Sequence, residues 1–188
     1  REQQELRDQQ RANEVDNKES AQGDGGCGKT TLFKLILGSL KKKSGSIQIF
    51  GSANTETIRD NISIIDQHSK LFNDTIFNNI KYSNNATEKQ VLQIIKELNT
   101  TIFDKLDKGI HTKVGIDSEF MSGGQRQLII LLRTYFRKAK LILMDEPIAS
   151  VDENNVPLIL KMIYRISEGR TLLVVSHNDR ISEVTNKE

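Results

Sequence analysis

The run from residue 121 to residue 152, MSGGQRQLIILLRTYFRKAKLILMDEPIASVD, is the feature that most constrains the fold of this chain. Ser122 followed three residues later by Gln125 has the spacing of a capping box, so we expect a helix to begin there. Gly123 and Gly124 place no side chains over the free N–H groups of that helix start, which predicts an anion site. The apolar run at 128–132 predicts that most of this helix is buried.

A short, wholly apolar run at 141–144 follows a basic turn and is typical of a strand covered on both faces. Two adjacent carboxylates, Asp145 and Glu146, stand at its C-terminal end. In open α/β sheets, ligands bind at the carboxyl ends of the strands. We therefore expect a binding site beside these two residues.

Residues 23–30, GDGGCGKT, fit the phosphate-binding pattern G-x-x-x-x-G-K-[ST]. Glycines in such a loop let successive backbone N–H groups surround a phosphate, while Lys29 would neutralise the β- and γ-phosphates and Thr30 would bind Mg²⁺. The alternative interpretation is a glycine-rich linker that precedes Lys-Thr. The predicted ATP-binding residues are Gly23, Asp24, Gly25, Gly26, Cys27, Gly28, Lys29, Thr30 and Thr31.

Alternating apolar segments indicate the remaining elements. We expect strands at 47–50, 62–65 and 171–176, a helix at 31–40 and a helix at 154–167. The helix at 31–40 is predicted to bury Leu32, Leu35, Ile36 and Leu40. Thr87 and Gln90 form a second capping-box pattern, ahead of an apolar helix face at Val91, Ile94, Ile95 and Leu98.

Length and composition restrict the classes of protein to which this chain can belong. The 188 residues suit one domain, and 27 basic against 25 acidic residues give a net charge of +2, which argues against a charge-driven binder of duplex nucleic acid. The single cysteine, Cys27, excludes an internal disulfide. Residues 1–22 are polar, show no strand pattern and are expected to be disordered or a solvated helix, which leaves the phosphate loop without its preceding buried strand.

These motifs together resemble the nucleotide-binding domains of ATP-binding cassette (ABC) proteins. Ser122, Gly123, Gly124 and Gln125 match the family signature, although Met121 stands where the family usually has Leu. Residues 141–146 match the Walker B strand, with Glu146 as its catalytic glutamate, and Asp152 ends the following D-loop. The resemblance implies that Gln67 contacts Mg²⁺, that Asp145 and Thr30 hold the same ion, and that His177 is the switch histidine contacting the γ-phosphate.

The resemblance also implies a fold and a domain plan. The expected fold is α/β, a P-loop NTPase core with a mostly parallel sheet plus the ABC helical subdomain at about 83–135. The partial ABC ATPase domain spans 23–188, and against the family pattern the chain is expected to be shortened at both ends. The family's adenine-stacking aromatic residue has no counterpart in 1–22.

The segment 71–76, LFNDTI, resembles the exporter branch of the family, including half-transporters of the mitochondrial iron–sulfur-export type. By resemblance, the chain hydrolyses ATP with Mg²⁺ and pairs head to tail with a second such domain, whose signature acts in trans. It would couple to transmembrane domains at the cytosolic face of a membrane, or the matrix face of a mitochondrion-derived organelle, with no nucleic-acid partner. A soluble, non-transport ABC ATPase and a non-catalytic ABC fragment remain the alternatives.

Overall fold

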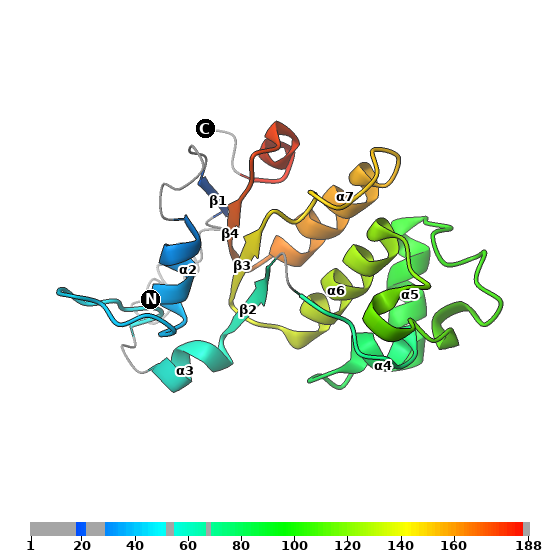
Figure 1. The fold of residues 1–188 in the computed structure, drawn as a ribbon, viewed down its shortest axis with the longest axis horizontal. Coiled ribbons are helices and arrows are strands. Elements are labelled where there is room, and N and C mark those ends of the chain that lie inside the picture. Colours follow the sequence, from blue (N-terminus) through cyan, green and yellow to red (C-terminus); the bar gives the residue numbers. More distant parts are fainter. Residues whose placement is uncertain (1–17, 22–28, 52–54, 67–68, 186–188) are drawn as a thin grey trace, which may run out of the picture.

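The computed structural model describes residues 18–21, 29–51, 55–66 and 69–185 (Figure 1). Its centre is a parallel sheet of four strands in the order β1-β4-β3-β2. The strands are β1 (Lys18–Ala21), β2 (Ile62–Ile65), β3 (Leu141–Asp145) and β4 (Thr171–Val175). Because every pairing is parallel, the carboxyl ends of all four strands lie at one edge of the sheet.

Helices cover both faces of this sheet (Figure 1). On one side lie α2 (Lys29–Ile36) and α3 (Thr55–Asp60), and on the other lie α6 (Gly123–Arg137) and α7 (Val156–Ser167). Alternate residues of β3 enter different cores: Ile142 and Met144 pack with α6 and α7, whereas Leu141 and Leu143 pack with Phe33 of α2. The layered α/β architecture with a parallel sheet is therefore confirmed.

A helical region packs against α6 on the side away from the sheet (Figure 1). It contains α4 (Ile76–Lys81), α5 (Glu88–Leu98) and the short 3₁₀ turns η1 (Gly109–His111) and η2 (Ile116–Ser118). The Thr87–Gln90 capping box forms as predicted at the start of α5. A last 3₁₀ turn, η3 (Asp179–Glu183), follows β4.

The expectation that residues 1–22 hold no strand was wrong for 18–21. These residues form β1, which pairs in parallel with β4 from Lys18↔Leu172 to Ala21↔Val175. In the described sheet β1 has a single strand neighbour. Such a strand is held by backbone hydrogen bonds to one partner, so a polar sequence can form it without the apolar run that pattern analysis seeks.

Two further expectations near α2 were wrong. No strand forms at 47–50, where Ile49 makes only an isolated bridge, because Phe50 (φ +52°) and Gly51 (φ +73°) take left-handed conformations that end extended structure. Among the α2 side chains that the structure describes, Phe33 is the buried one, 2 % exposed, whereas Leu32 is 44 % exposed and the predicted Leu35 and Ile36 are half-buried. Leu40 is exposed because α2 ends at Ile36, before that position.

The helices at 123–137 and 156–167 are buried as the sequence predicted. Leu128, Ile129 and Leu131 of α6 are completely enclosed, as are Ile159 and Met162 of α7. Among the described residues, no helix has the length and apolar character needed to cross a membrane.

Candidate functional site

The carboxyl ends of β3 and β4 bring two predicted catalytic residues together. Glu146 follows β3 and His177 follows Ser176 at the end of β4. Since β3 and β4 are paired neighbours, with Asp145 opposite Val175, both residues lie at the same sheet edge. The His177 Nε2 atom is 3.8 Å from Glu146 Oε1, which places an imidazole and a carboxylate side by side.

The Glu146 carboxylate is held by donors from the end of β4. Its Oε2 accepts from the Ser176 hydroxyl at 3.0 Å, and its Oε1 accepts from the His177 backbone N–H at 2.8 Å. The Glu146 backbone N–H donates to the carbonyl oxygen of Val175 at 2.8 Å. Glu146 also has φ +51°, a left-handed conformation that non-glycine residues seldom adopt and that often marks functional sites.

The start of α6 forms the predicted capping box. Ser122 N–H donates to Gln125 Oε1 at 2.8 Å, and Gln125 N–H donates to Ser122 Oγ at 3.2 Å. The Gln125 amide also donates to the Ile102 carbonyl at 2.9 Å, which fixes the helix start to the helical region. This geometry satisfies two of the helix's free groups and leaves the first turn without side chains at its two glycines.

The two signature glycines pack against the D-loop and the residue that orients it in the same chain, Gly123 against Ser150 and Gly124 against Asn155, contacts that the sequence did not predict. A Cβ atom on Gly123 would lie 1.9 Å from the Ser150 carbonyl oxygen. A Cβ atom on Gly124 would lie 3.1 Å from the Asn155 side chain. Glycine at these positions thus permits close approach of the signature to the D-loop, a requirement separate from the anion site that the sequence suggested.

The D-loop carboxylate of Asp152 is oriented from within the chain. Asn155 Nδ2 donates to both Asp152 carboxylate oxygens, at 3.0 and 2.8 Å, and the Asn155 N–H donates to the Asp152 carbonyl at 2.9 Å. Asn155 is also the residue that lies against Gly124. The D-loop and the signature are therefore joined through one asparagine.

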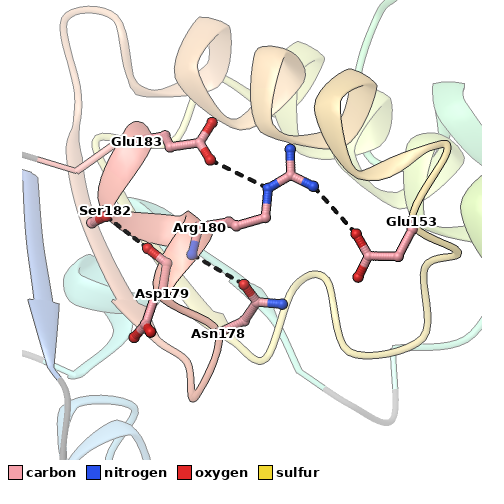
Figure 2. A network of polar contacts seen from close by, with 6 residues as sticks. All are labelled: Glu153, Asn178, Asp179, Arg180, Ser182 and Glu183. Atoms are coloured by element: carbon pink, nitrogen blue, oxygen red, sulfur yellow. Dashed lines mark hydrogen bonds and ion pairs between the residues drawn. The ribbon is translucent and has the colours of Figure 1, made fainter.

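A polar network links the segment after His177 to the residue after Asp152 (Figure 2). Asn178 Oδ1 accepts from the Arg180 N–H at 3.0 Å and begins η3. The Arg180 guanidinium donates to Glu183 Oε1 at 3.2 Å and to Glu153 Oε2 at 3.3 Å (Figure 2). The segment after β4 is thereby connected by side chains to Glu153, the residue that follows the D-loop.

A cavity of about 500 Å³ lies between the sheet edge and the start of α6. Asp145, Glu146, Asp66 and Ser69 line it from the strand side, and Gly123 is among the residues of α6 that close it. Carboxylate and hydroxyl oxygens are the donors that Mg²⁺ prefers, and the ion is usually bound by one or two carboxylates, water and substrate phosphates. The donor set fits Mg²⁺ in that shared mode, although within the described ranges no three His, Cys, Asp or Glu residues cluster as a metal site.

The phosphate-loop residues Gly23 to Gly28 and the predicted Mg²⁺ residue Gln67 lie outside the described residues. Lys29 and Thr30 begin the helix α2, and Thr31 is exposed in its first turn. The order is therefore strand β1, an intervening segment of the pattern G-x-x-x-x-G, and helix α2. That strand-to-helix order is the context that distinguishes a phosphate loop from a glycine-rich linker.

Comparison with known proteins gives the same assignment. Residues 20–149 match the family described as ABC transporter. P-glycoprotein 14 of Caenorhabditis elegans is 32 % identical over 161 residues, which cover 82 % of this chain and 12 % of that protein. The ATP-dependent lipid A-core flippase of Francisella novicida is 32 % identical over 171 residues, covering 87 % of this chain and 28 % of the flippase.

A solved structure shares the fold. A bacterial Atm1-family ABC exporter with ATP bound matches with a TM-score of 0.80 and 25 % sequence identity, over 91 % of this chain and 31 % of the exporter chain. This chain thus spans less than a third of the length of each of these three proteins. Its motifs, its parallel sheet and these similarities agree, and the chain belongs to the ABC transporter family, of which it carries the ATP-binding domain.

Proposed function

We propose that this chain is the ATP-hydrolysing domain of an ABC exporter and that it powers transport through transmembrane domains. The observation that carries the proposal is the meeting of Glu146 and His177 at the sheet edge, 3.8 Å apart, beside the cavity that Asp145 also lines. The similar P-glycoprotein and lipid A-core flippase support an exporter rather than a soluble, non-transport ABC ATPase. The choice of transported substrate would belong to the transmembrane domains.

Each predicted site residue has a role in ATP hydrolysis. The backbone of Gly23 to Gly28 would surround the β-phosphate, and Lys29 would neutralise the β- and γ-phosphate oxygens. Glu146 would polarise the attacking water, since a positioned carboxylate base contributes roughly 10²–10⁴ to the rate. His177 would contact the γ-phosphate, and its side chain is 59 % exposed at the sheet edge, where a nucleotide could reach it.

A Mg²⁺ ion would be held by Thr30, Gln67 and Asp145. Of these, Asp145 is the residue whose placement supports the proposal, because it lines the cavity next to Glu146. When bound, Mg²⁺ neutralises the developing charge on the phosphate oxygens. The part of this chain is to present oxygen donors to the ion and to keep Glu146 beside them.

The partner would be a second ABC nucleotide-binding domain, arranged head to tail with two-fold symmetry. Ser122, Gly123, Gly124 and Gln125 of one subunit would face the ATP held by the other, and Asp152 would lie at the contact between them. The coupled transmembrane domains would place the chain at the cytosolic face of a membrane. The matrix face of a mitochondrion-derived organelle is the finer alternative, suggested by the half-transporter resemblance.

Replacing Glu146 by Gln tests the proposal. The Glu146→Gln variant keeps the size and planar shape of the side chain but replaces one acceptor oxygen by an amide NH2 and removes the base, so we expect unchanged ATP–Mg²⁺ binding and a loss of turnover of at least 10²-fold. Steady-state phosphate release and equilibrium nucleotide binding by the purified chain measure the two quantities. The matched control is Glu168→Gln, an exposed glutamate at the end of α7.

The control variant should hydrolyse ATP at the parent rate. Equal turnover in the parent and in Glu146→Gln would show that Glu146 is not the base. A parent chain that binds no nucleotide would contradict the proposed function altogether.

A further inference from the structure

We propose that Ser176 is a positioning residue, whose hydroxyl sets the orientation of the Glu146 carboxylate for attack on ATP. This inference rests on the proposed function, in which Glu146 is the base. It concerns a residue to which sequence reasoning gave no role. Ser176 is 4 % exposed, so its hydroxyl must find partners within the protein.

The hydroxyl of Ser176 lies between Glu146 and the backbone of the following loop. It donates to Glu146 Oε2 at 3.0 Å and accepts from the Asn178 N–H at 3.1 Å. An ionised carboxylate can only accept and the Asn178 N–H can only donate, so the Ser176 hydroxyl donates to Glu146 and accepts from Asn178. The Ser176 hydroxyl therefore fixes the Glu146 carboxylate relative to the loop backbone at Asn178.

The two carboxylate oxygens of Glu146 have separate donors. Ser176 holds Oε2, and the His177 N–H holds Oε1 at 2.8 Å. Two bonds to two oxygens define the plane of the carboxylate, whereas the His177 bond alone would leave it free to rotate about that contact. Loss of the Ser176 hydroxyl thus removes orientation without removing the base.

The bonds leave Glu146 able to act on water. An ionised carboxylate has about four lone-pair sites, and Ser176 and His177 occupy one on each oxygen. Each oxygen keeps a site that can accept from a water molecule. The Ser176 contact therefore orients the base and does not block it.

The loop that carries the donors is itself braced. Asn178 caps η3 through the Arg180 N–H, and Arg180 spans from Glu183 to Glu153 (Figure 2). Glu146 is in turn constrained at its backbone, where φ is +51° and the N–H is bonded to Val175. With both sides fixed, the Ser176 hydroxyl and the His177 N–H together set where the carboxylate lies.

The kinetic test compares Ser176→Ala with Ser176→Thr in the full chain. Ser176→Ala should lower kcat for ATP about tenfold with the KM for ATP within about twofold, because a hydrogen bond to a charged group is lost from the positioning of the base and not from nucleotide binding. Ser176→Thr keeps the hydroxyl and should restore kcat to near the parent value. A kcat that Ser176→Ala leaves unchanged in an active parent would overturn the inference.

The matched control is Ser167→Ala. Ser167 is likewise buried and its hydroxyl donates to one acceptor, the Tyr164 carbonyl at 2.6 Å, but it lies at the end of α7 away from Glu146. Its removal should leave kcat unchanged. An equal fall in kcat for Ser167→Ala and Ser176→Ala would mean that general loss of stability explains both, and would overturn the positioning role.

A second measurement requires no hydrolysis. Amide hydrogen exchange of His177 and Asn178 reports the bonds from these N–H groups to Glu146 and Ser176. Ser176→Ala should accelerate exchange at both amides, and Ser167→Ala should not. Unchanged exchange in Ser176→Ala would contradict the inference even if the parent lacked ATPase activity, which would instead contradict the proposed function.

Discussion

At the scale of single residues, Gly123 shows how closely the signature and the D-loop are packed. The nearest atom to a Cβ at this position is a backbone oxygen, that of Ser150 at 1.9 Å, which cannot move aside as a side-chain end could. The corresponding neighbour of Gly124 is the side chain of Asn155 at 3.1 Å. The two glycines thus differ in what a methyl group would displace.

We therefore expect Gly123→Ala and Gly124→Ala to differ in stability. Gly123→Ala should lower the free energy of unfolding by about 1–3 kcal/mol, since the D-loop backbone must shift. Gly124→Ala should be close to neutral, because the helical preference of Ala over Gly, up to about 1 kcal/mol, offsets a small movement of Asn155. Urea unfolding of both variants measures the difference, and equal losses would contradict the close approach of Gly123 to Ser150.

The Asp74 carboxylate should make the stability of the folded chain depend on pH. The Asn78 amide and the Thr75 N–H donate to its carboxylate at 2.9 and 2.6 Å, and these bonds lower the pKa of Asp74 below its ordinary value. A carboxyl group whose pKa is lower in the folded state stabilises the protein above its unfolded pKa, and that contribution disappears as pH falls through the folded pKa. The parent should exceed Asp74→Asn in stability at pH 7, with the difference shrinking below about pH 4, as measured by thermal unfolding across pH. A difference independent of pH would contradict it.

At the scale of elements, Arg133 joins the signature helix to the segment that follows Gln67. Its guanidinium donates to the Asn79 carbonyl, the Asn79 side chain and the Lys70 carbonyl at 2.8, 2.9 and 3.3 Å. It also lies 5.3 Å from the centre of the Phe72 ring. Burial lowers the pKa of Arg133. The oxygen atoms that accept its hydrogen bonds belong to α4 and to the loop before it.

Arg133→Ala should therefore lower the free energy of unfolding by about 1–3 kcal/mol, because Asn79 is fully buried and would lose its charged partner. Arg133→Lys should not restore stability, since an ammonium group cannot reproduce the planar, forked donor arrangement. Arg137→Ala, one turn later on α6 and exposed, is the control and should change stability by less than about 0.5 kcal/mol. Equal losses in the free energy of unfolding for Arg133→Ala and Arg137→Ala, measured by chemical unfolding, would contradict a stabilising role of Arg133 between these elements.

At the scale of the whole molecule, the elements with strong local signals in the sequence could be predicted. Two capping boxes, at Ser122 and Thr87, are visible in the sequence as residues at a fixed spacing. The strands at 62–65 and 141–144 are visible as short apolar runs. Strand β1 has no such signal, because it depends on backbone pairing with β4, which lies far along the chain. The roles of Ser176, Asn155 and Arg133 likewise come from tertiary contacts that no spacing rule contains.

The proposed function requires that two copies of this domain close around ATP and that Glu146 then acts as the base in hydrolysis. Sedimentation velocity of Glu146→Gln, with and without ATP–Mg²⁺, tests it most directly, because bound ATP would persist and hold the pair together. We predict a monomer without nucleotide and a dimer with ATP–Mg²⁺ that ADP does not produce. A variant that binds ATP and stays monomeric would contradict the claim that the signature of one subunit completes the site of the other.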